Sequence, residues 1–225
     1  MPIKDQPHSY PINEFKSGEA WRLFKIMGEF VEGFDTLYPL GPAVSIFGSA
    51  RVAEDHEYFK LTVETAKRFG QAGYAVITGG GPGLMRAANQ GASQAHADSV
   101  GLNIKLPFEE EPNPYANIQV DFHYFFVRKV MFLKHSKACV IMPGGFGTLD
   151  EAFETITLIQ TRRIKQVPVI LFGRRYWEGL VQWVRDRMVD EAMISESDMD
   201  LFHLVDTPEE AVKIVTDFYG TDSKK

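Results

Sequence analysis

The chain has 225 residues, of which 44% are hydrophobic and 24% are charged. This ordinary composition excludes a disordered chain, a collagen-like repeat and a disulfide scaffold, and the length suits one α/β domain. The 30 acidic residues outnumber the 24 Lys and Arg residues, so the formal net charge is -6. This acidic balance disfavours a broad face for nucleic-acid polymers but permits a small anionic ligand in a locally positive pocket.

The N-terminal part of the chain divides into an arm and a helix. Residues 1–16 are polar and interrupted by prolines, which predicts a loose arm. Residues 17–34 predict an amphipathic helix, because apolar side chains recur there at three- and four-residue steps. These side chains are Trp21, Phe24, Met27, Phe30, Val31 and Phe34. A helix face with this many aromatic side chains is typical of a core face or an oligomer contact rather than a cofactor site.

From residue 43 onward, short β-rich runs alternate with helix-like segments. Strands are expected at Ala43–Phe47, Tyr74–Thr78, Ser99–Ile104, Ile118–Phe122, Ala138–Met142, Pro168–Phe172 and Leu201–Val205. Helices are expected over about 55–72, 82–96, 126–136, 146–162, 175–190 and 208–219, and an acidic, proline-rich loop over 107–114.

Several of these strands are continuously apolar, as expected for a sheet that is covered on both faces. The alternation of strands and helices predicts an α/β fold. Its sheet is expected to be doubly wound, mostly parallel and Rossmann-like, with helices on both faces. We expect a single domain over residues 17–220, followed by a frayed tail at 221–225.

Cysteine usage and the N-terminal sequence indicate a cytoplasmic location. Cys139 is the single cysteine, and it lies in the apolar run 138–142, which is typical of a buried core residue. No stretch approaches the roughly 20 apolar residues of a membrane span. The N-terminus lacks the basic and apolar regions of a secretory signal. We therefore expect a cytoplasmic protein with no membrane partner.

Glycine-rich turns directly follow three of the predicted strands. Their sequences are Phe-Gly-Ser-Ala-Arg at 47–51, Gly-Gly-Gly-Pro-Gly-Leu-Met at 79–85 and Pro-Gly-Gly-Phe-Gly-Thr at 143–148. Glycine lets the backbone approach a ligand closely, and free N–H groups at a helix start attract anions. A single glycine-rich turn is equally well explained as a tight turn with no ligand. Three of them at the carboxyl edge of one sheet favour a phosphorylated ligand.

The same turns disfavour two common classes of nucleotide-binding enzyme. No Gly-Lys-Ser or Gly-Lys-Thr follows any of them, so none is a Walker loop. The first turn also lacks the Gly-x-Gly-x-x-Gly pattern of a dinucleotide site, which disfavours hydride transfer.

Charged residues near the third turn have a structural and a functional interpretation. Thr148 and Glu151 have the spacing of a capping box, in which Glu151 would bond to the backbone of the cap. Alternatively, Glu151 faces a sugar beside a phosphate held at the helix start. Arg128 and Lys129 open a predicted helix, where cations oppose the dipole, so they are either an exposed basic pair or functional residues. Arg51 is a weaker third candidate.

No metal site or nucleophile system is indicated. The six histidines lack metal-ligand spacing, and His123, although close to Arg128 in sequence, is better explained as a structural residue. No Ser–His–Asp or Cys–His arrangement is evident.

Taken together, these residues resemble the Lonely Guy family. Residues 143–151 match its Pro-Gly-Gly-x-Gly-Thr-x-x-Glu motif, Arg128-Lys129 stands at its Arg-Lys position, and Gly79–Met85 resembles its second glycine turn. The resemblance implies a Rossmann-like hydrolase that cleaves nucleoside 5′-monophosphates, AMP-like or cytokinin ribotides, to free base and ribose 5-phosphate. It also implies a homo-oligomer, a dimer or higher, that needs no cofactor. Some relatives carry a lysine decarboxylase label, but no lysine is identified as a pyridoxal phosphate site.

By position, the resemblance implies Arg128 and Glu151 as the catalytic pair. Glu151 would stabilise positive charge on the ribose and position water, while Arg128 would orient the nucleotide. Substrate contacts are implied at Gly48, Ser49, Gly80, Gly81, Gly83, Met85, Lys129, Pro143, Gly144, Gly145, Phe146, Gly147, Thr148 and Thr157.

Two other functions fit the same sequence. One is a non-catalytic carrier that binds a nucleotide, a pterin-type cofactor or a signalling phosphate in the same pocket. The other is an oligomerisation module built on the aromatic helix at 17–34, which would bind no ligand. The chain also departs from the plant members at the first two glycine turns and at both ends. Whether a prenylated cytokinin nucleotide is a substrate is therefore open.

Overall fold

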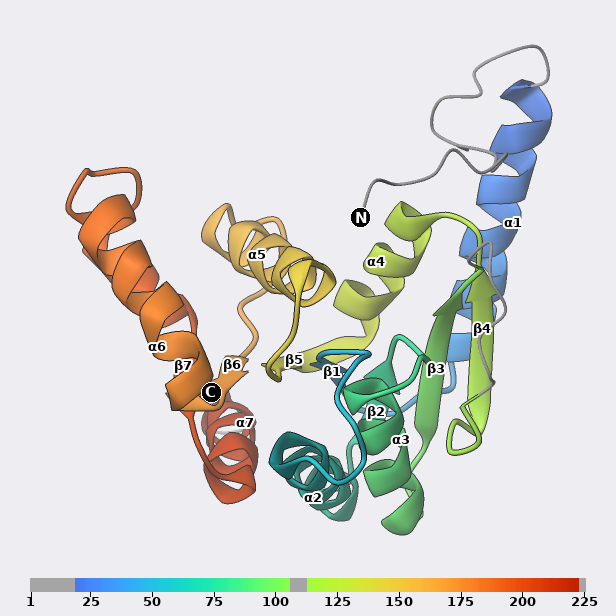
Figure 1. Ribbon diagram of the computed structural model, residues 1–225. Coiled ribbons are helices and arrows are strands. Elements are labelled where there is room, and N and C mark those ends of the chain that lie inside the picture. The colour runs from blue at the N-terminus through green and yellow to red at the C-terminus, as the bar shows by residue number, and fades with distance from the viewer. Residues whose placement is uncertain (1–18, 106–112, 223–225) are drawn as a thin grey trace, which may run out of the picture.

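The computed structural model describes residues 19–105 and 113–222, which form a seven-stranded sheet with helices on both faces (Figure 1). The strand order is β4-β3-β2-β1-β5-β6-β7, and every neighbouring pair is parallel. The strands are β1 (Ala43–Phe47), β2 (Ala75–Thr78), β3 (Ser99–Ile104), β4 (Ile118–Phe122), β5 (Ser136–Ile141), β6 (Val169–Phe172) and β7 (His203–Val205). The predicted α/β, Rossmann-like class is confirmed, and the sheet is entirely rather than mostly parallel.

Two apolar layers enclose the sheet, because successive strand residues point to opposite faces. In β1, Val44 and Ile46 pack into one layer, whereas Ala43 and Phe47 pack into the other. The first layer is completed by α2 (Glu57–Gln71), α3 (Leu84–Gln94) and α7 (Pro208–Asp222). The second is completed by α1 (Glu19–Leu37), α4 (Phe125–His135), α5 (Phe146–Gln160) and α6 (Arg174–Trp183).

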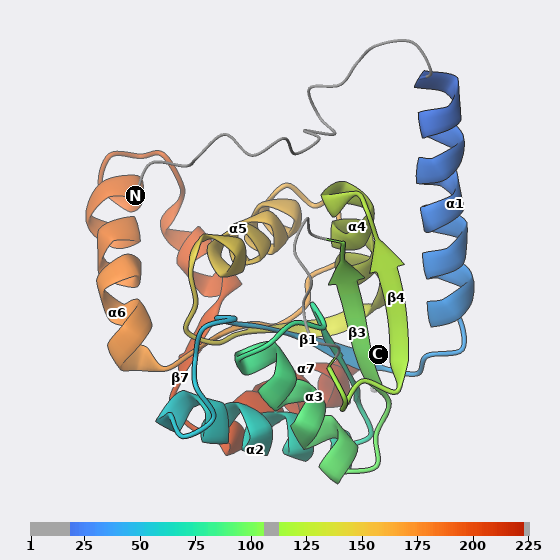
Figure 2. The same cartoon turned by 45° about the vertical axis from the view of Figure 1, so that its right-hand side comes forward.

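Helix α1 runs along the β4 edge and extends beyond the body of the molecule (Figure 2). Leu37 at its end is fully buried, while Phe30 and Phe34 pack against the core. The remaining predicted stripe residues are exposed: Trp21, Phe24, Met27 and Val31. The core-face interpretation of the stripe therefore holds only for its C-terminal half.

Several boundaries differ from the sequence-based expectation. Strand β5 begins two residues earlier than predicted, and the helix expected over 175–190 is α6 followed by a π-helical segment, Val184–Val189. A 3-10 helix, Glu196–Leu201, shortens the last strand to three residues. Helix α7 continues through Asp222, so the expected tail at 221–225 begins too early. The expected arm at 1–16 and most of the loop at 107–114 lie outside the described residues.

The three glycine-rich turns meet at the carboxyl edge because the chain order reverses beside β1. The chain moves outward from β1 to β4 and then returns to add β5 on the other side of β1. The backbone N–H of Ser49 donates to the carbonyl of Pro143 (3.0 Å), and the N–H of Leu84 donates to the carbonyl of Ser49 (2.9 Å). Gly83 permits this contact, because it has a φ of +63° and a Cβ there would collide with Ser49.

Candidate active site

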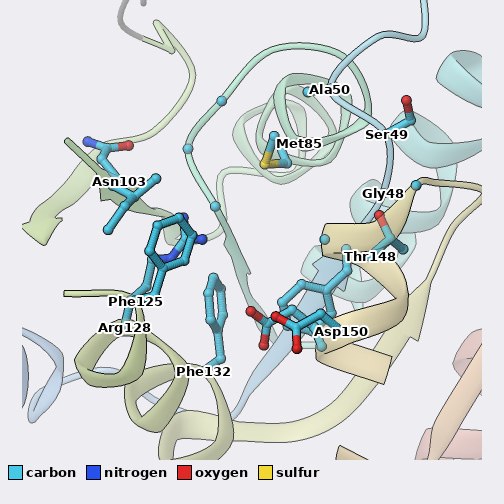
Figure 3. A pocket seen from close by; sticks show the side chains of 18 of the residues that line it. Gly48, Ser49, Ala50, Met85, Asn103, Phe125, Arg128, Phe132, Thr148 and Asp150 are labelled. Carbon is cyan, nitrogen blue, oxygen red and sulfur yellow. The ribbon is translucent and has the colours of Figure 1, made fainter. Parts of the chain in front are cut away.

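A cavity of about 1040 Å³ opens at this carboxyl edge (Figure 3). Its walls come from the three glycine-rich turns, the ends of β3 and β4, the face of α4 and the first two turns of α5. The position is the one expected for a ligand in an open parallel sheet, where crevices form at the point of chain reversal.

Most of the residues singled out from the sequence line this cavity. They are Gly48, Ser49, Arg51, Gly80, Gly81, Met85, Arg128, Gly145, Phe146, Gly147, Thr148 and Glu151. Five expected substrate contacts do not line it: Gly83, Lys129, Pro143, Gly144 and Thr157.

The positions off the cavity have structural surroundings of their own. Pro143 accepts the hydrogen bond from Ser49, and the carbonyl of Gly144 accepts one from the Tyr176 hydroxyl (2.8 Å). Thr157 is exposed on α5. Pro143 and Gly144 thus shape the turns, and Thr157 lies farther along α5, away from them.

The N-terminus of α5 faces the cavity, but the expected capping box is wrong. Gly145 is the N-cap, and the helix begins at Phe146, so Thr148 is already the third helical residue. No side chain caps this helix start. Glu151 therefore does not bond to the cap, and the first-turn N–H groups lack a capping side chain, which suits an anion.

Glu151 is a buried carboxylate on the cavity wall, only 7% exposed. Burial raises the pKa of its carboxyl group, and the nearby positive charges of Lys129 and Arg128 act in the opposite direction. The raised pKa shows that desolvation outweighs the two cations. A carboxylate in this position has lost most of its water and interacts strongly with any positive charge that develops beside it.

Lys129 is held by three carboxylates instead of facing the cavity. Its Nζ lies 2.6 Å from Glu154 Oε2, 2.9 Å from Asp150 Oδ2 and 3.4 Å from Glu151 Oε1. Burial lowers the pKa of Lys129. The hydrogen bonds to Glu154 and Asp150 and the charge of Glu151 together raise it by more, so the net shift is upward. Lys129 therefore remains charged and links α4 to α5.

Arg128 is oriented toward the cavity by aromatic rings. Its guanidinium carbon lies 5.1 Å from the ring centroid of Phe125 and 5.8 Å from that of Phe132. Its Nη1 donates to the carbonyl of Leu102 (3.4 Å). Because the flat guanidinium group stacks on rings and stays charged, these contacts hold a fixed positive charge across the cavity from α5 (Figure 3).

Sequence reasoning missed the polar end of the cavity beyond Arg128. Asn103 comes from β3, Lys105 directly follows that strand, and Gln119 and Asp121 come from β4. No glycine motif or charge cluster marks them. The available signal was the placement of polar residues at alternate positions near the carboxyl ends of two adjacent strands.

A buried amide network also went unnoticed in the sequence. Asn89 on α3 is fully buried; its Oδ1 accepts hydrogen bonds from Thr78 Oγ1 (2.6 Å) and Asn113 Nδ2 (2.9 Å). Its Nδ2 donates to Ser99 Oγ (2.9 Å), and Thr78 Oγ1 accepts from the N–H of Gly80 (3.0 Å). The network thus connects the second glycine turn to the segment that follows β3.

The remaining candidates lie away from the cavity. His123 Nδ1 is 2.8 Å from Glu29 Oε1, which agrees with its interpretation as a structural residue. Cys139 is buried as expected, and burial raises the pKa of its thiol to about 12. Within residues 19–105 and 113–222, no group of three or more His, Cys, Asp or Glu side chains could hold a metal ion. In the same ranges, no helix is long and apolar enough to cross a membrane.

With the geometry defined, comparison with known proteins identifies the family. The profile of a family described as "Possible lysine decarboxylase" matches residues 85–215, more than half of the chain. The chain belongs to this family. The match includes α4 and the motif at 143–151, and it confirms the resemblance to Lonely Guy proteins, which this family contains.

Plant proteins that carry the Lonely Guy name are among the curated relatives. One from Arabidopsis thaliana, named cytokinin riboside 5′-monophosphate phosphoribohydrolase, is 26% identical over 181 residues, covering 78% of this chain and 82% of the relative. A second Arabidopsis protein of the same name is 30% identical over 148 residues, covering 64% and 66%.

Solved structures share the fold of this family member. The molybdenum cofactor carrier protein from Chlamydomonas reinhardtii superposes with a TM-score of 0.59 at 20% identity, covering 80% of this chain and 98% of that chain. The molybdenum cofactor binding protein from Rippkaea orientalis has a TM-score of 0.58 at 18% identity, covering 79% and 97%. At these identities the likeness concerns the fold alone.

Proposed function

We propose that this protein hydrolyses the N-glycosidic bond of nucleoside 5′-monophosphates, releasing the free base and ribose 5-phosphate. The observation that carries the proposal is the buried Glu151 carboxylate, which lies one helical turn from the anion-binding start of α5 and shares the cavity wall with Arg128. A phosphate, a ribose and a base could then contact successive parts of one cavity.

The 5′-phosphate would bind between the first and third glycine turns. The cavity wall there consists of Gly48, Ser49, Gly145, Phe146 and Gly147. Gly145 and Gly147 have open space where a Cβ would stand, so a ligand can approach the backbone closely. Backbone N–H groups and the positive end of the α5 dipole supply the attraction without requiring a basic protein surface.

The ribose would lie beside Glu151. During cleavage, the bond from the anomeric carbon to the base nitrogen breaks and its electron pair leaves with the base, so the ribose becomes positively charged. The Glu151 carboxylate stabilises that charge and positions a water molecule. The water oxygen bonds to the anomeric carbon, and one water proton is transferred so that the base departs protonated.

Arg128 would orient the nucleotide and offset negative charge on the phosphate or the departing base. Its stacking between Phe125 and Phe132 supports this role, because a guanidinium group held in advance loses little freedom when the substrate binds. Lys129 would act through Glu151 rather than through the substrate.

The decisive experiment follows release of free base and ribose 5-phosphate from AMP, CMP and GMP. We expect wild-type protein to cleave at least one of them and Glu151→Gln to lose at least 100-fold in kcat while still binding nucleotide. Glu209→Gln is a control, because Glu209 also forms an ion pair with a cation, Arg68, but it lies on α7 and does not line the cavity. Tight binding without cleavage by the wild type would refute the hydrolase proposal.

A non-catalytic carrier remains the second candidate, and the size of the cavity favours it. About 1040 Å³ exceeds what one nucleoside monophosphate fills and lies just above the usual range for ligand sites. A carrier would bind a larger phosphorylated ligand without turnover, and its affinity would not depend on ionised Glu151.

We also propose that the protein forms a homo-oligomer in the cytoplasm. The exposed side chains of Trp21, Phe24, Met27 and Val31 on α1 form an apolar surface of the kind that subunit contacts cover. Light scattering coupled to size-exclusion chromatography should show a dimer or larger assembly. Replacing Trp21 and Phe24 by Ser should reduce its mass, and an unchanged mass would exclude α1 as the contact.

A further inference from the structure

The β3–β4 end of the cavity is polar and rich in hydrogen-bond acceptors. Asn103 and Asp121 are register partners on adjacent parallel strands, so their side chains emerge on the same face of the sheet. Asn103 Nδ2 donates to Asp121 Oδ1 at 3.0 Å and is 3.4 Å from Gln119 Oε1. Lys105 Nζ lies 3.7 Å from Asp121 Oδ2. All four residues line the cavity.

Among the residues that the structure describes, the contacts of Asp121 leave acceptor capacity for a ligand. A carboxylate has about four lone-pair positions. Asn103 and Lys105 engage one position on each oxygen of Asp121, and the Asp121 side chain is 52% exposed. Asn103 is fixed in turn, because both amide hydrogens face Asp121 and Gln119. A group with two N–H hydrogens could therefore donate to this end without displacing an existing contact.

The polar end lies on the other side of the cavity from the first and third glycine turns (Figure 3). Asn103, Phe125 and Arg128 lie on one side of the cavity, and Gly48 and Thr148 lie on the other (Figure 3). Phe125 is 53% exposed, and its ring offers a flat apolar surface on which a base can stack. A nucleotide with its phosphate at α5 and its ribose at Glu151 would extend its base toward this end.

We propose that the Asn103–Asp121 pair recognises the exocyclic amino group opposite the glycosidic bond of the base. This inference rests on the proposed function and names its substrate class: nucleoside 5′-monophosphates of 6-aminopurines and 4-aminopyrimidines. The amino group donates to Asp121, whereas an oxo group at the same position would set two acceptors against each other. An alkyl chain on the amino group would remove one N–H and desolvate the Lys105–Asp121 pair.

Matched substrate pairs test the proposal. AMP and IMP differ at this one position, as do CMP and UMP. We expect wild-type kcat/KM to favour AMP over IMP, and CMP over UMP, by at least about tenfold, because an oxo group would both lose the hydrogen bond and face the Asp121 carboxylate acceptor to acceptor. AMP should also be preferred over its N6-isopentenyl derivative.

Asp121→Asn should reduce the AMP-to-IMP ratio at least fivefold, because a carboxamide can donate to the oxo group. Asp98→Asn is the control. Asp98 is also exposed and contacts an amide, that of Asn117, but it lies at the amino end of β3, whereas the cavity lies at the carboxyl ends of the strands. Equal rates for AMP and IMP, a preference for the isopentenyl nucleotide, or an unchanged ratio in Asp121→Asn would each overturn the proposal.

The same pairs separate this inference from the hydrolase proposal. If the wild type cleaves no nucleotide, hydrolysis is refuted, and the dissociation constants of AMP and IMP for the same protein then provide the test. A Kd ratio of about tenfold that decreases in Asp121→Asn supports amino-group recognition in a carrier, and equal Kd values overturn it.

Discussion

The Lys129 ammonium group lies 3.4 Å from Glu151 Oε1, and it is held there by closer contacts with Asp150 and Glu154. The resemblance implied a substrate contact for Lys129, but this residue does not line the cavity. Its position makes it a link between α4 and α5 that contacts Glu151 and lowers the pKa of the Glu151 carboxyl group against the effect of burial.

Replacing Lys129 by Met should shift the acidic limb of the kcat/KM profile to higher pH. Burial raises the pKa of Glu151 and Lys129 lowers it, so loss of the ammonium group raises the pKa further. A reaction that needs the carboxylate then fails at a higher pH than in the wild type. Lys134→Met on the same helix, where the ammonium stacks on Phe34, should leave the profile in place. Superimposable profiles for Lys129→Met and wild type would show that Lys129 does not act through Glu151.

Glu151→Gln should increase the free energy of unfolding at neutral pH. Because the folded-state pKa is above the unfolded value, Glu151 favours folding most below the unfolded pKa, and this contribution is lost as pH rises through the folded pKa. Gln has no charge to desolvate, so its advantage should grow from about pH 4.5 to pH 7.5. Urea unfolding at several pH values measures the difference. The prediction is contradicted if the difference in free energy of unfolding between the variant and the wild type is less favourable to the variant at pH 7.5 than at pH 4.5.

Arg128→Lys should lower kcat/KM by about 10- to 100-fold, because an ammonium group cannot stack between two rings or form paired hydrogen bonds to a phosphate. Arg86→Lys is a suitable control. The Arg86 guanidinium also lies over a ring, that of Tyr115 at 5.9 Å, but Arg86 does not line the cavity. Steady-state kinetics on the best substrate compares the two. Equal losses in both variants would point to general loosening of the fold rather than to a role at the cavity.

Asn89→Ala should destabilise the protein by about 2–4 kcal/mol, because it removes one buried hydrogen bond each from Thr78, Ser99 and Asn113. The second glycine turn should loosen too, since Gly80 bonds to Thr78. Urea unfolding gives the stability, and hydrogen exchange at Gly80 reports on the turn. Gln94→Ala, an exposed amide at the end of α3, should cost less than about 0.5 kcal/mol. A comparable small cost for Asn89→Ala would mean that the network contributes little.

The sequence by itself determined the layered α/β fold and the glycine-rich edge of the site. Continuous apolar strands and intervening amphipathic helices are local patterns, and parallel order follows from their alternation. The turns after β1, β2 and β5 were predictable at one edge because the carboxyl ends of parallel strands must share it.

Only the tertiary structure decided which side chains act on one another. Glu151 and Thr148 had the spacing of a capping box, but α5 begins two residues before Thr148, and a lysine from α4 occupies the position beside Glu151. Asn103 and Asp121 meet only because β3 and β4 pair in one particular register. Such contacts join elements that are distant in the chain. They depend on packing and register, which no local pattern of apolar residues or glycines specifies.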